Sequence, residues 1–274
     1  MDIDTRQELI AELVKERQNV RALALSEQFD VSLETIRKDL QALQDRGVLV
    51  RVHGGAQVRP IRQESAYERR RSVDLAAKQA IAEVAMCDVK NDSTIYLDYG
   101  TTTYALAVKL VEQDRRLTVL TNAMPIAQVL SRAEHIETVV LGGILRRNEK
   151  SLFGPLAERA LEDLYMDAGF FGCAGVHAKA GITNPHPFEA AASHKAMTHC
   201  NAVVVLAAAD KLDSVAAHRV AGLADIDTLI TNASPGAELT QALDAADTTL
   251  VIAEEESDGL SRPPDVPEPE REGP

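Results

Sequence analysis

The sequence predicts an α/β protein with a small N-terminal domain of helices and a larger domain built on a mostly parallel sheet. Two observations predict this class. Helical apolar spacing and one β-branched segment fill the first 57 residues, whereas beyond Ser93 short β-branched segments alternate with helical patterns. With 274 residues and 45% hydrophobic side chains, the chain can bury two cores of unequal size. We expect domains at 1–57 and 76–253, a connector at 58–75 and a disordered acidic, Pro-rich tail at 254–274.

Apolar residues at helical spacing predict three helices within the first 45 residues. A first helix spans 5–17, and a shorter pattern at 23–29 indicates a second. Ser32 is placed to accept a hydrogen bond from a free amide at the start of the third helix. The third helix is expected to bury Ile36, Leu40 and Leu43.

The third helix turns polar and basic side chains outward near its N-terminal end, which is the end that enters the major groove in helix-turn-helix proteins. Gly47 follows at a C-cap position, and the segment 48–52 is β-branched enough for one arm of a two-stranded wing. This order predicts a winged helix-turn-helix. The candidate contacts to bases and phosphates are Ser32, Leu33, Glu34, Thr35, Arg37, Lys38, Arg51, His53 and Gly54. The alternative is a small helical bundle in which Arg37 and Lys38 merely solvate an exposed face.

The net charge of −13 is unevenly distributed along the chain. Residues 1–71 carry 13 Lys and Arg against 12 Asp and Glu, so the acidity belongs to the remainder. A near-neutral domain still binds DNA where its basic side chains share a face. Because a single head would bind weakly, we expect a homo-oligomer, a dimer or tetramer, that sets two heads on paired half-sites of double-stranded operator DNA.

Short motifs run through nearly the whole chain except the tail. They are Val31-Ser32, Thr35-Ile36-Arg37, Asp39-Leu40, Leu43, Gly47, Arg51-x-His53-Gly54-Gly55-Ala56, Tyr67, Arg70, Lys78, Ile81-Ala82, Asp98-x-Gly100-Thr101-Thr102, Thr121-Asn122 and Gly142-Gly143. These motifs resemble those of DeoR-type bacterial regulators. The resemblance implies a repressor of a carbohydrate operon with a Rossmann-like sensor domain, similar in fold to ribose-5-phosphate isomerase, that binds a phosphorylated sugar or related metabolite.

In the second domain, small or polar residues end several of the predicted strands, which lie at 94–97, 117–120, 138–141, 202–206, 228–230 and 249–252. Ligands of open α/β sheets bind beyond the carboxyl ends of the strands, so these residues should converge on one pocket. The candidate effector contacts at these ends are Asp98, Gly100, Thr101, Thr102, Thr121, Asn122, Gly142 and Gly143. The turn from Gly100 to Thr102, ahead of a helix starting near Tyr104, suits a phosphate, although threonines also serve as plain helix caps.

A phosphate ligand favours a nearby cation, and Arg146, Lys195 and Lys211 can return to the same edge of the sheet. By resemblance, Lys211 matches a late family lysine and Glu189 helps to order the pocket. The family commonly has an aspartate three residues before that lysine, whereas this chain has Ala208 there. This departure bears on the contacts to sugar hydroxyls.

We expect neither a metal nor a cofactor. His194 and His199 are five residues apart and do not share a helical face, and the three cysteines form no paired zinc motif. The unpaired cysteines, the lack of a spanning apolar run and the lack of a signal peptide predict a soluble cytoplasmic protein without membrane contact. The basic connector is expected to contact DNA or the acidic domain, or to form a solvated helix.

The leading interpretation is a DNA-binding regulator, not an enzyme, whose effector changes how two heads meet the operator. A rival is a sugar-phosphate isomerase-like enzyme with an accessory DNA-binding head, since fold does not fix function. Asp98, Asp210 and Glu189 are its candidate carboxylates, and they show no paired acid/base spacing. A third reading is an architectural DNA-binding protein that senses no ligand.

Overall fold

The computed structural model describes residues 2–17, 19–45, 48–52, 54–58 and 67–254. The chain divides into two compact units, Met1–Glu64 with Val215–Ala217, and Ser65–Ser214 with His218–Pro274. The predicted domain boundaries stay predictions, because most of the connector, at 59–66, lies outside the described residues, as does the tail from 255. Within the described part of the chain, no helix is long and apolar enough to cross a membrane, and no group of His, Cys, Asp or Glu could hold a metal ion.

The first unit contains the three predicted helices and the predicted hairpin. Its elements are α1 (Ile3–Arg17), β1 (Asn19–Arg21), α2 (Ala22–Phe29), α3 (Leu33–Asp45), β2 (Leu49–Val52) and β3 (Gly55–Val58). Ser32 caps α3 as expected, accepting a hydrogen bond of 3.1 Å from the amide of Thr35. Ile36, Leu40 and Leu43 are buried, which confirms the core face of α3.

Strand β1 was not expected from the sequence. It pairs antiparallel with β3, so the wing is a three-stranded sheet in the order β1-β3-β2. Gly55 permits this pairing, because a Cβ at that position would lie 2.0 Å from the carbonyl oxygen of Val20. With three residues and one buried side chain, β1 is too short for the alternation that marks a strand.

The second unit is built on a seven-stranded sheet whose order is β15-β14-β12-β9-β4-β5-β6, with every neighbouring pair parallel. The strands are β4 (Ser93–Leu97), β5 (Leu117–Thr121), β6 (Ile136–Val140), β9 (Ala168–Gly172), β12 (Val203–Leu206), β14 (Thr228–Thr231) and β15 (Thr249–Ile252). Six of them coincide with the predicted β-branched runs. The central strand β9 was not predicted.

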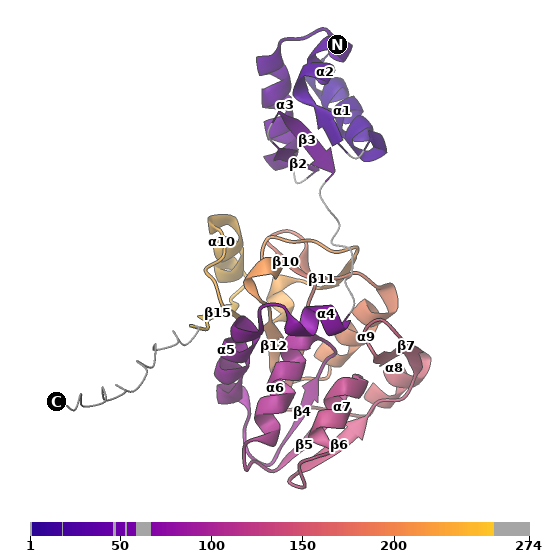
Figure 1. Ribbon diagram of the computed structural model, residues 1–274, viewed down its shortest axis with the longest axis vertical. Coiled ribbons are helices and arrows are strands. Elements are labelled where there is room, and N and C mark those ends of the chain that lie inside the picture. Colours follow the sequence, from indigo (N-terminus) through magenta and orange to yellow (C-terminus); the bar gives the residue numbers. More distant parts are fainter. Residues whose placement is uncertain (1, 18, 46–47, 53, 59–66, 255–274) are drawn as a thin grey trace, which may run out of the picture. The chain divides into compact units, whose positions relative to one another are not determined.

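Helices cover both faces of this sheet, as expected (Figure 1). One core joins the sheet to α5 (Leu75–Ala85), α6 (Thr101–Val111) and α7 (Met124–Leu130). The other joins it to α8 (Pro155–Leu161), α9 (Pro187–Met197) and α10 (Ala237–Ala245). Successive residues of one strand serve opposite cores: Tyr96 lies in the second and Leu97 in the first. This alternation is the period of two that a strand requires.

The second unit also contains smaller elements. A short helix α4 (Tyr67–Ser72) follows the undescribed connector, and β7 (Ile144–Arg146) pairs with β8 (Ser151–Phe153) as a hairpin. A separate sheet contains β10 (Gly175–His177), β11 (Gly181–Asn184) and β13 (His218–Ala221). Three single-turn 3-10 helices complete the unit: η1 (Met86–Asp88), η2 (Ala209–Lys211) and η3 (Leu223–Asp225).

Candidate DNA interface and effector site

The outward face of α3 is polar and basic at its N-terminal end. Glu34, Arg37 and Lys38 are exposed, and Arg37 lies 3.9 Å from the Glu34 carboxylate, with both side chains more than half exposed. A pair so loose and so solvated contributes little to stability, so Arg37 remains available to a phosphate or a base. Thr35 is half-buried, and its hydroxyl is 2.8 Å from that of Ser32.

Leu33, one of the candidate DNA contacts, is half-buried and packs against the core of the first unit. A helical side chain leans over the turn that precedes it, so an apolar residue in the first turn of α3 can cover the core instead of pointing to solvent. The exposed charged residues at the N-terminal end of α3 are therefore Glu34, Arg37 and Lys38.

The wing is fastened to α3 through Arg51. The backbone amide of Arg51 donates to the Gln44 side chain over 3.0 Å, and its guanidinium donates to Gln41. Gly54 has φ of 82°, a left-handed conformation that favours glycine, and its carbonyl accepts a 2.8 Å hydrogen bond from Ala22. A further candidate, His53, lies outside the described residues.

At the carboxyl edge of the large sheet, Asp98 follows β4 and is fully buried. Its carboxylate accepts a 2.7 Å hydrogen bond from the Ser193 hydroxyl on α9, and the Tyr96 hydroxyl lies 3.5 Å away. Burial raises the pKa of Asp98 to about 7, and the nearby charge of Glu189 acts in the same direction. Asp98 is thus a buried carboxyl held between two elements of the site.

The turn after Asp98 has the geometry of an anion cradle. Gly100 has φ of 140°, and α6 begins at Thr101, three residues earlier than expected. The Thr103 hydroxyl donates to the Gly100 carbonyl over 3.1 Å, while Thr101 is half-buried and Thr102 is buried. The first amides of a helix have no intrahelical acceptor and carry partial positive charge, as a phosphate requires.

The next strand end places Thr121 and Asn122 at the same edge. The Thr121 hydroxyl donates to the Leu97 carbonyl over 2.7 Å, which joins β5 to β4. The Asn122 side chain is 1% exposed, and within the described part of the chain neither its amide nitrogen nor its amide oxygen has a hydrogen-bond partner. A buried amide without partners costs free energy, so such groups point to a bound polar molecule.

The hairpin β7–β8 carries charge to this edge. Arg146 of β7 and Ser151 of β8 both donate to the carboxylate of Glu189, which is fully buried at the start of α9. Gly143 allows the hairpin to close, because a Cβ there would lie 2.5 Å from the Phe153 carbonyl oxygen. Gly142 is exposed with open space around it. The predicted residues Arg146 and Glu189 are therefore partners of each other.

The two predicted lysines are placed differently. Lys211 of η2 pairs with Asp210 at 3.0 Å. The pKa of Lys78 is lowered, mainly by the burial of Lys78 and next by the positive charge of Lys211. Lys195 lies about 160° around α9 from Ser193, so it is on a different face from the residues that reach Asp98. The role of Lys195 in the effector site stays a prediction. Ala208, at the position where the family commonly has an aspartate, is buried, and the nearby carboxylate is that of the exposed Asp210.

Several residues of the site were not among the candidates. Glu149 in the β7–β8 turn is fully buried and accepts from Arg70 of α4, while the exposed neighbouring Lys150 pairs with Glu68 of the same helix. Lys78 donates to the carbonyls of Arg70 and Val73, which ties α5 to α4. Arg70 and Lys78 belong to the motifs noted in the sequence, whereas Glu149 and Ser193 have no sequence signal.

Comparison with known proteins agrees with this division of the chain. Residues 6–61 match the model of the DeoR-like helix-turn-helix domain, and residues 74–233 match that of the DeoR C-terminal sensor domain. The regulator YulB of Bacillus subtilis is 33% identical over 89% of this chain and 94% of its own length. The regulator GlpR of Haloferax volcanii is 32% identical over 94% of this chain and 98% of its own.

Among solved structures, ribose 5-phosphate isomerase A of Methanocaldococcus jannaschii is similar to 49% of this chain and 53% of its own chain, with 18% identity and a TM-score of 0.37. The two family models together match most of the described residues, and the relatives align over nearly their whole length. The chain therefore belongs to the DeoR family of helix-turn-helix transcription regulators.

Proposed function

We propose that this regulator represses a carbohydrate operon and that a phosphorylated sugar, bound at the carboxyl edge of the large sheet, controls its hold on DNA. The names of relatives support both parts of this proposal: the L-fucose operon activator of Haemophilus influenzae names a sugar operon, and GlcR of Bacillus subtilis is named a repressor. The buried, unpartnered amide of Asn122 beside the Gly100–Thr102 cradle supports a polar ligand at this edge.

The observation that carries the proposal is the chain of contacts between α4 and the site. The segment that emerges from the connector bonds to the β7–β8 hairpin through Arg70 and Glu149, and the same hairpin bonds to α9 through Arg146 and Glu189. An anionic ligand at the cradle competes with Glu189 for Arg146. Releasing the hairpin shifts α4, and this differential contact is what couples ligand to DNA.

We further propose that the protein acts in the cytoplasm as a homodimer or homotetramer. Two DNA-binding domains related by a two-fold axis match operators made of paired half-sites. Once one domain is bound, the effective concentration of the second at its half-site is high, so the pair binds more tightly than either alone. Sedimentation of the full chain, with and without operator DNA, tests the assembly. A monomer on a single half-site would contradict it.

The test of the main proposal starts from DNA selected from a random pool by the full chain. Binding to that DNA is titrated in the presence of individual pentose and hexose phosphates, and thermal shift identifies which of them the sensor binds. We expect one or a few to raise the melting temperature and to weaken DNA binding by roughly 5- to 150-fold. A Glu149→Gln variant should keep the thermal shift and lose most of the effect on DNA.

Asp98 favours a second candidate, an isomerase-like activity, because a buried carboxyl with a pKa of about 7 can act as a general base. The regulator remains our proposal, since Asp98 is fully buried and hydrogen-bonded to Ser193. Turnover of pentose and hexose phosphates decides between them. Conversion that disappears in Asp98→Asn would establish the enzyme.

A further inference from the structure

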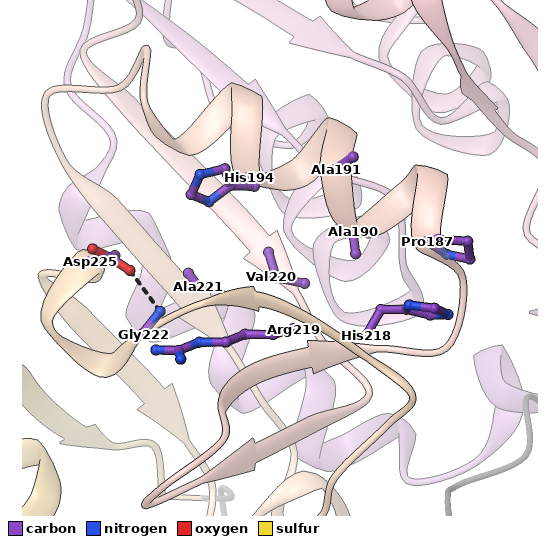
Figure 2. A pocket seen from close by; sticks show the side chains of 10 residues that line it. All are labelled: Pro187, Ala190, Ala191, His194, His218, Arg219, Val220, Ala221, Gly222 and Asp225. Carbon is purple, nitrogen blue, oxygen red and sulfur yellow. Dashed lines mark hydrogen bonds between the residues drawn. The ribbon is translucent and has the colours of Figure 1, made fainter.

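A second groove lies between α9 and β13 (Figure 2), and it is separate from the residues of the effector site. Its volume is about 460 Å³. Its floor is made of small side chains, and its polar groups are His194 from α9, and His218, Arg219 and Asp225 from β13 and the turn after it. A groove of this size admits a small metabolite.

The cation of this groove is available. Arg219 is exposed, and among the residues that the structure describes no carboxylate lies within ion-pair distance of it. The one acid of the groove, Asp225, already accepts a 2.6 Å hydrogen bond from the Gly222 amide (Figure 2). A guanidinium fork without a partner is suited to a carboxylate or a phosphate.

Gly222 lies beside the two charged groups of the groove. A Cβ on this residue would lie 2.9 Å from the guanidinium of Arg219 and 3.1 Å from the carboxylate of Asp225. Both groups are the ends of side chains that can move, so they face the same space beside Gly222 without depending on the glycine.

The histidines extend this site from both walls. His194 projects from α9 and His218 from β13, near Pro187 at the other end of the groove (Figure 2). Each neutral imidazole has one donor nitrogen, so each ring can hydrogen-bond to a polar group of a ligand that fills the groove. The histidines therefore add polar groups to both walls, while Arg219 supplies the cation.

Helix α9 connects the groove to the effector site. Ala190, Ala191 and His194 face the groove, whereas Glu189 and Ser193, one turn apart on another face, bond to Arg146 and Asp98. A ligand that fixes α9 from the groove therefore acts on the elements that hold the effector site.

We propose that the groove between α9 and β13 is a second binding site, for the oxyanion of a small metabolite bearing a carboxylate or a phosphate, with Arg219 as its principal contact. The site is distinct from the proposed sugar-phosphate site and does not depend on it. Its occupancy would modulate that site through α9.

The test follows the imidazole signals of the full chain by NMR, with ¹³C-labelled histidine assigned through His194→Gln and His218→Gln. Inorganic phosphate and malonate serve as the two probes, so that phosphate and carboxylate ligands are distinguished. We expect either or both to shift the His194 and His218 signals saturably at millimolar concentration. Absence of a shift with both probes would overturn the proposal.

Variants separate this groove from the effector site. Arg219→Gln should raise the ligand concentration at the midpoint of the titration by roughly tenfold or more, the usual loss of a charged hydrogen bond. Asp225→Asn, which keeps an acceptor for the Gly222 amide, should strengthen it by removing a repelling charge. Lys179→Gln, at an exposed lysine paired with Glu238 at 3.2 Å, is the matched control and should leave it unchanged. If Arg219→Gln showed the same histidine shifts as the wild type, the probes would be bound elsewhere and the proposal would be rejected. Loss of the shifts in Lys211→Gln would also reject it, because Lys211 lies outside the groove.

Discussion

The Ser193 hydroxyl donates a 2.7 Å hydrogen bond to the Asp98 carboxylate, joining α9 to the end of strand β4. This bond lowers the pKa of Asp98, while burial raises it to about 7. In Ser193→Ala the buried carboxyl loses a donor, and we expect a loss of about 1 to 3 kcal/mol in the free energy of unfolding. Urea denaturation at pH 7 measures it. An unchanged midpoint would mean that Asp98 does not need this partner.

The raised pKa of Asp98 also predicts a pH dependence. The folded state holds the proton up to pH 7, whereas the unfolded chain releases it near the ordinary pKa of 3.8, so the contribution of Asp98 to stability falls as the pH rises from about 4 to 7. Asp98→Asn removes this loss. Its stability relative to the wild type should therefore rise between pH 5 and pH 7, by no more than about 3 kcal/mol. A constant difference across this window would contradict the raised pKa.

Arg37 and Lys38 are expected to contact DNA without supporting the fold. Because both are exposed, alanine at either position should change the free energy of unfolding by less than about 0.5 kcal/mol. Each should weaken DNA binding and reduce the slope of log K against log salt by about 1 if it meets a phosphate. The exposed Lys90 of the second unit is the matched control. Equal losses in Lys90→Ala would show that the effect is not local to α3.

The buried ion pair between α1 and α3 should make the first unit sensitive to the loss of either partner alone. Arg6 and Asp39 are both less than 10% exposed, with nitrogen and oxygen 2.7 Å apart, and Gln7 donates to the same carboxylate over 3.0 Å. Asp39→Ala leaves a buried cation, so we expect a loss of about 3 to 5 kcal/mol, whereas Arg6→Met with Asp39→Leu should lose much less. Thermal denaturation of the three proteins makes the comparison. If the double variant were as unstable as the single one, packing rather than charge would be the cause.

The cap of α3 provides a smaller test. Ser32→Ala removes the acceptor of the Thr35 amide and should cost about 1 kcal/mol of stability, while Ser32→Asp should restore it. Because aspartate repels phosphate, Ser32→Asp should nevertheless bind DNA less tightly than the wild type. Chemical denaturation and gel shift on the same samples separate the two roles of this residue.

Much of the fold could be predicted because its signals are local. The spacing of Ile36, Leu40 and Leu43 defines the buried face of α3, and the β-branched runs define six strands of the large sheet. Strand β9 was not predicted because the two phenylalanines between Gly169 and Gly172 have no β-branched neighbours. Gly169 is set by tertiary packing, since a Cβ there would lie 2.5 Å from the Cys200 sulfur.

The site divides in the same way. Asp98, Thr121 and Asn122 follow strands directly, so the rule for parallel sheets brings them to one edge. Ser193 and Glu149 reach that edge through α9 and a hairpin whose position depends on contacts far along the chain, which no spacing reveals. The same limit applies to Lys195, because the direction of its side chain depends on which face of α9 is buried.

The central place of β9 governs how the second unit assembles. Strands β4, β5 and β6 lie on one side of it and β12, β14 and β15 on the other, so β9 bridges two halves that are far apart in sequence. Without residues 168–172 the flank of β4 has no partner strand in this order, and an unpaired strand edge is prone to aggregation. We therefore expect a chain that ends before residue 168 to aggregate.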